Sequence, residues 1–187
     1  PEETPTHRLG TYYLETGYGI RPSKVTYDRK HSAITEYDLT KVDVEQLLDG
    51  FDWLHLSGIT PALSKSCADF IMVCLKAAKE NAINTAVETT GFAPFEVIEK
   101  LLPYIDTVLM DIKHIDAAKH KQFTTQSNEL ILENAVKIAK NAKKLIIRVP
   151  VIPTFNDTEE EIGAIAYFAS QLDGVDEINL LPYHRFG

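Results

Sequence analysis

Six side chains between residues 83 and 184 of this sequence have the chemistry to bind a small charged ligand. They are Glu88, Thr89, Asp111, Lys113, Arg148 and His184. The carboxylates accept hydrogen bonds, the ammonium and guanidinium groups donate them and carry positive charge, and the imidazole can do either. Such a set suits a zwitterionic molecule that also carries hydroxyl groups. We assign none of them a catalytic role or a metal-binding role.

Each of these residues lies at or near the end of a short apolar run. The runs cover residues 83–90, 107–114, 145–152 and 177–184, and three amphipathic stretches separate them. Short β-branched runs that alternate with helical patterns predict parallel strands joined by crossover helices. The carboxyl ends of parallel strands share one edge of the sheet, where ligands collect. We therefore expect the charged side chains to converge there.

Side-chain alternation predicts which face of the sheet carries this site. Asp111 and Lys113 are two residues apart, so they share a face. Met110 and Ile112 then point the other way, onto the crossover helices. Two alternatives stay open: strand ends are polar in most sheets, and the charged groups could satisfy one another as an ion-pair network without a ligand.

The first 82 residues predict a β-hairpin lobe and one βα unit. Residues 11–16 and 24–29 are rich in β-forming residues and flank a loop that contains Gly and Pro. Tyr13, Tyr27 and Arg29 are expected to share one hairpin face, where they could hydrogen-bond a hydroxyl-rich ligand. The alternative is a cross-strand aromatic pair that stiffens the hairpin.

Together these patterns predict an α/β fold, with a partial parallel (β/α) barrel-like sheet, flanking helices and an N-terminal β-hairpin lobe. Residues 32–37 are expected to extend the β region of the lobe. A buried strand over 51–56, in which Trp53 is expected to pack rather than to bind a ligand, and a helix over 64–80 should follow, with Ser64 as the helix cap. That helix runs directly into the strand at 83, so one continuous sheet is expected across residues 81–84. Further helices are expected at 94–102, 116–123, 128–141 and 158–172.

Composition excludes several function classes. The 187 residues carry a net charge of −8, which argues against a nucleic-acid partner, and no apolar run is long enough to span a membrane. The sequence starts at Pro1 without an apolar signal segment, so we expect a fragment of a cytoplasmic protein. Cys67 and Cys74 are seven residues apart in a helical pattern, which predicts buried apolar side chains rather than a disulfide.

From residue 83 onward the sequence resembles the glycyl-radical-enzyme activating enzymes of the radical SAM superfamily, typified by the pyruvate formate-lyase activating enzyme. The matching stretches are Ala86–Gly91, Leu109–His114, Ser127–Asn134, Ile147–Pro153, Phe155–Asp157 and Glu177–His184. The resemblance implies a barrel that binds S-adenosylmethionine at its open end and a glycyl radical enzyme as partner.

The same resemblance implies roles for single residues. Lys113 and His184 would meet the methionine carboxylate. Glu88, Thr89 and Asp111 would lie near the methionine portion and a monovalent cation, and Arg148 would face the cofactor. Glu88 stands where the family often has Asp, which puts the cation role in doubt. The family holds its 4Fe-4S cluster on a CxxxCxxC loop, and the two cysteines of this chain form no such loop. We therefore expect the isolated chain to be inactive.

Residues 10–80 instead resemble the 2-keto-3-deoxygluconate kinases of the PfkB (ribokinase) family. The matching stretches are Thr11–Glu15, Arg21–Val25, Tyr27–Arg29 and Trp53–Leu63. The resemblance implies that Tyr13, Tyr27 and Arg29 contact a sugar acid, but the glycine-rich phosphate segment and catalytic Asp of the family are missing. The chain thus reads as a chimera of a sugar-kinase-like segment, 1–82, and an activating-enzyme-like partial barrel, 83–187. The alternatives are a sugar-acid kinase fragment and a non-catalytic folded chimera.

Overall fold

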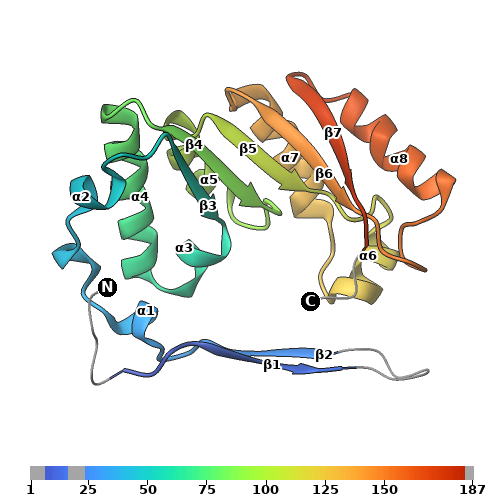
Figure 1. The fold of residues 1–187 in the computed structure, drawn as a ribbon. Coiled ribbons are helices and arrows are strands. Elements are labelled where there is room, and N and C mark those ends of the chain that lie inside the picture. The colour runs from blue at the N-terminus through green and yellow to red at the C-terminus, as the bar shows by residue number, and fades with distance from the viewer. Residues whose placement is uncertain (1–6, 17–23, 184–187) are drawn as a thin grey trace.

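Two sheets organise the chain in the computed structural model, which describes residues 7–16 and 24–183. The first is an antiparallel hairpin of β1 (Thr11–Glu15) and β2 (Lys24–Asp28). The second is parallel and runs in the order β3 (Trp53–Ser57), β4 (Asn84–Thr89), β5 (Thr107–Asp111), β6 (Leu145–Pro150) and β7 (Val175–Leu181). The five strands lie in chain order, as in part of a (β/α) barrel (Figure 1). The predicted α/β fold is confirmed.

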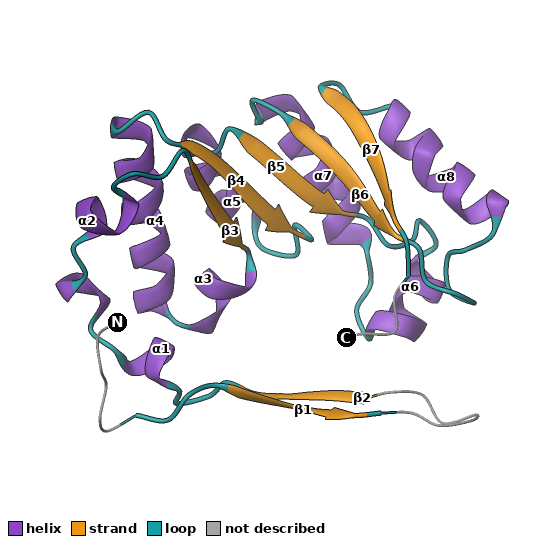
Figure 2. Cartoon of the chain, in the orientation of Figure 1, coloured by secondary structure: helices purple, strands orange, loops and turns teal. Residues whose placement is uncertain are grey.

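Helices and 3₁₀ turns fill the connections between successive strands from β2 onward. They are α1 (Ala33–Glu36), α2 (Val44–Leu48), α3 (Ile59–Leu63), α4 (Lys65–Glu80), α5 (Phe95–Leu101), α6 (Ala117–Thr124), α7 (Glu129–Asn141) and α8 (Glu159–Ser170), with 3₁₀ turns at Leu39–Lys41 and Leu102–Tyr104. Helices α4, α5, α7 and α8 line one side of the parallel sheet (Figure 2). Because β3 pairs with β4, the sheet is continuous across residues 81–84, as predicted.

The core lies between the parallel sheet and these helices. Met110, Ile112 and Ile147 are at most 1% exposed and pack with Leu75 and Ile138 from α4 and α7. Successive side chains in a strand point to opposite faces, so the residues between them face away from the helices. The predicted orientation of Met110 and Ile112 is therefore confirmed, and the other face is left for polar groups.

The helix starts follow local hydrogen-bonding rules. The Ser64 hydroxyl accepts from the Cys67 N–H at 3.1 Å, so α4 begins where predicted. Thr158 and Glu161 form a reciprocal capping box at the start of α8. These caps satisfy backbone donors that have no partner inside the helix.

Two expectations for the first lobe are wrong. Within residues 32–37 the chain forms the single turn α1 rather than a strand, because the Glu36 N–H and the Thr35 hydroxyl both donate to the Ser32 carbonyl; only Ser32 keeps β character, in an isolated bridge with Arg8. Trp53 was expected to pack but is 56% exposed at the edge strand β3. The predicted hairpin itself is present, opposite the carboxyl ends of the parallel strands (Figure 1). Its connecting loop lies outside the described residues.

Candidate functional site

Arg148 joins two carboxylates at the carboxyl ends of three neighbouring strands. Its Nη1 donates to Glu88 Oε1 at 2.6 Å, and its Nε donates to Asp111 Oδ1 at 2.8 Å. The Nη2 atom also lies 2.8 Å from Asp111 Oδ1. The structure therefore brings together three of the side chains expected to converge.

Strand register explains this meeting. Asp111 of β5 pairs directly with Arg148 of β6, and paired residues of parallel strands point to the same face. Glu88 lies one strand away on β4, opposite Leu109 of β5. Leu109 and Asp111 share a face because they are two residues apart. All three charged groups thus lie on the face opposite the helix-packed core.

The electrostatics of the cluster follow from these contacts. The hydrogen bond from Arg148 lowers the pKa of Glu88, against the opposing effect of burial. Burial acts to lower the pKa of Arg148, but the hydrogen bonds to Glu88 and Asp111 outweigh it and raise that pKa. Glu88 is therefore held in the charged form beside the guanidinium.

Lys113 lines the same cleft without sharing in the ion pairs. The cleft holds about 600 Å³, and its walls include Ser57, Ile59, Phe92, Lys113 and Arg148. Within the described residues the Lys113 ammonium has no ion-pair partner. The predicted convergence of Asp111, Lys113 and Arg148 is confirmed as geometry. His184 lies outside the described residues.

Thr89 lines the cleft but is committed to its own turn. Its hydroxyl accepts from the Gly91 N–H at 2.9 Å.

The sequence analysis did not predict a role for His55 of β3, whose Nε2 lies 3.4 Å from Glu88 Oε1. The sequence did contain a signal for it, because the polar residues His55 and Ser57 alternate with the apolar Leu54 and Leu56 at the end of a predicted strand. The apolar wall formed by Ile59 and Phe92 was also missed, since nothing in their spacing distinguishes them from core residues.

The hairpin residues do not gather as expected. Tyr12, not Tyr13, pairs with Tyr27, and their ring centroids are 6.3 Å apart. Tyr13 pairs with Thr26 and projects from the opposite face. The Arg29 guanidinium stacks 4.3 Å from the centre of the Tyr27 ring. The expected common face of Tyr13, Tyr27 and Arg29 is therefore wrong, and the cross-strand aromatic pair is formed instead.

The two cysteines do not fit as ligands of an iron–sulfur cluster. Cys67 is 0% and Cys74 is 3% exposed, as predicted, and both pack within the fold on α4. The Cys67 thiol donates to the Ile34 carbonyl at 3.2 Å. Among the described residues no group of three or more His, Cys, Asp or Glu side chains could hold a metal ion.

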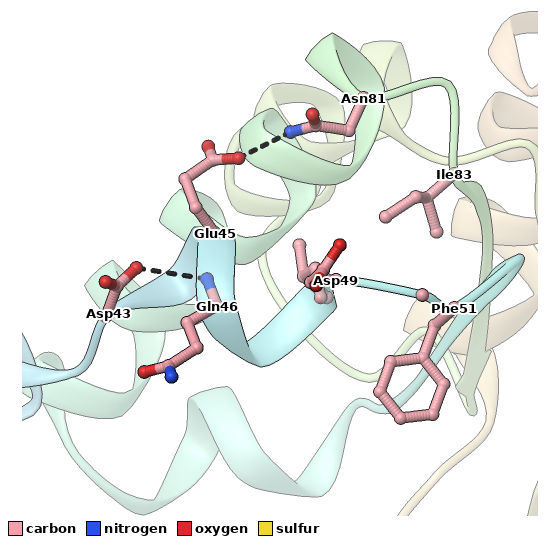
Figure 3. A pocket seen from close by; sticks show the side chains of 9 residues that line it. Asp43, Glu45, Gln46, Asp49, Phe51, Asn81 and Ile83 are labelled. Atoms are coloured by element: carbon pink, nitrogen blue, oxygen red, sulfur yellow. Dashed lines mark hydrogen bonds between the residues drawn. The ribbon is translucent and has the colours of Figure 1, made fainter.

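A second hollow lies at the other end of the strands, near the residues that precede β3 and β4 (Figure 3). It holds about 640 Å³ and carries three carboxylates, but two of them already have local partners. Asp43 caps α2 by accepting from the Gln46 N–H at 3.0 Å, and Glu45 accepts from Asn81 at 2.8 Å. We read this acidic surface as helix capping rather than as a ligand site.

No helix in the described part of the chain combines the length and the apolar character needed to cross a membrane.

The sequence was compared with known protein families and proteins. Residues 28–165 match the Radical SAM superfamily. The isethionate sulfite-lyase activating enzyme of Oleidesulfovibrio alaskensis is 45% identical over 120 residues, which are 63% of this chain and 38% of that enzyme.

Two solved structures resemble the fold. A domain of a pyruvate-formate lyase-activating enzyme from Bacteroides vulgatus is 32% identical with a TM-score of 0.63, over 70% of this chain and 80% of that one. The 2-dehydro-3-deoxygluconokinase of Thermotoga maritima is 29% identical with a TM-score of 0.53, over 74% of this chain and 45% of that one. The superfamily match starts before residue 83 and crosses it, so it covers parts of both segments distinguished in the sequence.

Proposed function

The chain belongs to the radical SAM superfamily, and on that basis we propose that its cleft binds S-adenosylmethionine as part of a glycyl-radical-enzyme activating enzyme. The observation that carries the proposal is the cleft at the carboxyl ends of β4, β5 and β6. It combines the Lys113 ammonium, which has no ion-pair partner among the described residues, with two anchored carboxylates and an apolar wall. This set fits a ligand that has a carboxylate, an amino group, ribose hydroxyls and an adenine ring.

Each cleft residue has a role in this proposal. Lys113 binds the methionine carboxylate through its ammonium group. Glu88 and Asp111 present their remaining oxygen lone pairs to the amino and hydroxyl donors of the ligand. Arg148 holds both carboxylates in place and keeps Glu88 charged, and Thr89 fixes the turn beside them. His184 is proposed as a further contact by resemblance alone.

The activity of a whole activating enzyme is a wider proposal. The chain covers 38% of the length of the curated relative described above, which is named for activating a lyase. We infer a glycyl radical enzyme as partner from such relatives. When bound beside a reduced iron–sulfur cluster, S-adenosylmethionine supplies a 5′-deoxyadenosyl radical. The cysteines within these 187 residues do not fit that cluster, so we assign this chain ligand binding only.

A thermal-shift assay tests the proposal. S-adenosylmethionine should raise the melting temperature of the wild-type chain in a saturable way, because a ligand that binds the folded state stabilises it. The Lys113→Ala variant should lose this shift, and Lys79→Ala, in the last turn of α4 and outside the cleft lining, should retain it. A wild-type melting temperature that does not respond to millimolar ligand would exclude the proposed function.

A second candidate is a sugar-acid site on the segment 1–82, with 83–187 as a separate unit. The likeness to the Thermotoga maritima kinase supports this candidate. The hairpin register counts against it, because Tyr13 and Tyr27 lie on opposite faces. We therefore rank it below binding of S-adenosylmethionine in the cleft.

A further inference from the structure

Three buried asparagines hold the loops that follow β4, β5 and β6. They are Asn128 at the start of α7, Asn134 within α7, and Asn156 before α8, and each is at most 1% exposed. In every case the side-chain amide donates to two backbone carbonyls outside its own helix. These asparagines lie in stretches that resemble the activating enzymes, but no role in the cleft has yet been given to them.

Asn156 ties together the ends of two strands that carry the cleft. Its Nδ2 donates to the Lys113 carbonyl at 2.7 Å and to the Pro150 carbonyl at 2.9 Å. Its Oδ1 accepts from the Ile152 N–H at 2.7 Å. One side chain therefore fixes the backbone of Lys113 relative to the end of β6, the strand on which Arg148 lies.

Asn134 holds the loop after β4, and Asn128 gives the loop after β5 a second set of contacts. Asn134 donates to the carbonyls of Gly91 at 2.7 Å and Ala93 at 2.8 Å, in the loop whose residues line one cleft wall. Asn128 donates to the carbonyls of His114 at 2.6 Å and Ile115 at 2.9 Å, directly after Lys113.

At Asn128 and Asn134 the side-chain NH₂ group is used for hydrogen bonding and the side-chain oxygen is not. The Oδ1 atoms of Asn128 and Asn134 are buried and have no hydrogen-bond partner in the described part of the chain. A buried acceptor without a partner is unfavourable. The side chains nevertheless stay in an orientation that directs both N–H groups at loop carbonyls. The four hydrogen bonds to the loop carbonyls therefore outweigh the cost of leaving the two amide oxygens without partners.

We propose that Asn128, Asn134 and Asn156 are positioning residues that hold the three loops in the geometry the ligand requires. The proposal rests on the proposed function, since it takes S-adenosylmethionine as the ligand of the cleft. None of the three asparagines contacts the ligand; each acts through the backbone of its loop. Asparagine suits the task because one planar NH₂ group supplies two donors, whereas an ionised Asp of the same shape supplies none.

The test substitutes Asn156→Asp, which keeps the shape and the acceptor for Ile152 but removes both donors. Asn141→Asp is the matched control, because Asn141 is exposed on α7 and donates only to the Lys137 carbonyl of its own helix. Two quantities are measured on each folded chain: amide hydrogen exchange over residues 111–116, without ligand, and the Kd for S-adenosylmethionine by calorimetry. Asn134→Asp, with exchange followed over residues 89–94, serves if Asn156→Asp does not fold.

We expect the Asn156→Asp chain to exchange at least tenfold faster over 111–116 and to bind at least tenfold more weakly, with the control unchanged in both. Unchanged exchange would overturn the proposal, and so would faster exchange with an unchanged Kd. If the wild-type chain does not bind the ligand at all, the proposed function fails and, with it, a role of the asparagines in ligand binding. If the wild-type chain does not bind but the Asn156→Asp chain still exchanges faster, then Asn156 does fix the loop and the assigned ligand is wrong.

Discussion

Arg148 is the residue on which the charge balance of the cleft depends. Its guanidinium faces Glu88 and Asp111 together, so removing it would leave two carboxylates close to each other without a counter-charge. The sequence placed these residues at strand ends through the alternation of apolar and polar positions. It could not indicate that Arg148 would reach across to β4, because that contact depends on strand order and side-chain length.

The Arg148→Met variant should therefore lose about 2 kcal/mol of unfolding free energy in urea titrations. We expect less than for a fully buried pair because the Glu88 side chain is 37% exposed. The control is Lys65→Met, which breaks an exposed pair with Asp69 at 2.5 Å and should cost less than about 0.5 kcal/mol. A loss at Arg148 no larger than at Lys65 would contradict this account of the cluster.

Glu161 gives the fold a pH dependence of its own. Hydrogen bonds from Lys119 and then from Thr158 lower its pKa to about 2 from an ordinary value of 4.5. Folding therefore favours the charged carboxylate, so its contribution is complete above pH 4.5 and is lost as pH falls toward 2. The Glu161→Gln variant should thus show a flatter decline of unfolding free energy between these pH values. A decline equal to that of the wild type would refute the assignment.

Secondary-structure elements were the most predictable level of this molecule. Helix α4 begins at its predicted cap, and the four strands from β4 to β7 fall within one or two residues of their apolar runs at the amino ends. Periodicity and capping are local, so the sequence carries them directly. Segment 32–37 was mispredicted because it contains the β-branched residues Ile34 and Thr35, yet its backbone closes a local helical turn through bonds to the Ser32 and Ala33 carbonyls.

The cap of α4 makes a quantitative prediction at this scale. Ser64→Ala should lower the unfolding free energy by about 1 kcal/mol, because the Cys67 N–H loses its acceptor. Ser64→Gly should lower the unfolding free energy by only about 0.3 kcal/mol, since glycine is tolerated at the N-cap position. No loss of unfolding free energy in Ser64→Ala, measured by chemical denaturation, would show that the side-chain hydrogen bond contributes nothing.

The hairpin should not bind a sugar acid by itself. The β1–β2 register places Tyr13 and Tyr27 on opposite faces, so the three expected contacts cannot reach one ligand. Calorimetry with 2-keto-3-deoxygluconate should detect no binding tighter than ~1 mM, about −4 kcal/mol. Binding above that strength, lost on Tyr27→Ala, would restore the sugar-acid reading.

The arrangement of the whole molecule explains why a ligand site forms at all. Helices pack on one side of the parallel sheet (Figure 1). They bury Met110 and Ile147, while the other face carries the charged cluster at its carboxyl edge. The sequence predicted this division from alternation within strands. It could not predict the facing position of the hairpin or the asparagine contacts, which join segments far apart along the chain.

The central claim is that S-adenosylmethionine binds at the carboxyl ends of β4, β5 and β6. A titration of the ¹⁵N-labelled chain with this ligand, followed by amide chemical shifts, tests it most directly. The account predicts saturable shift changes concentrated in residues 88–91, 111–114 and 148–152, with little change around the acidic hollow of Figure 3. Changes centred on that hollow or on the hairpin, or no changes at millimolar ligand, would contradict it.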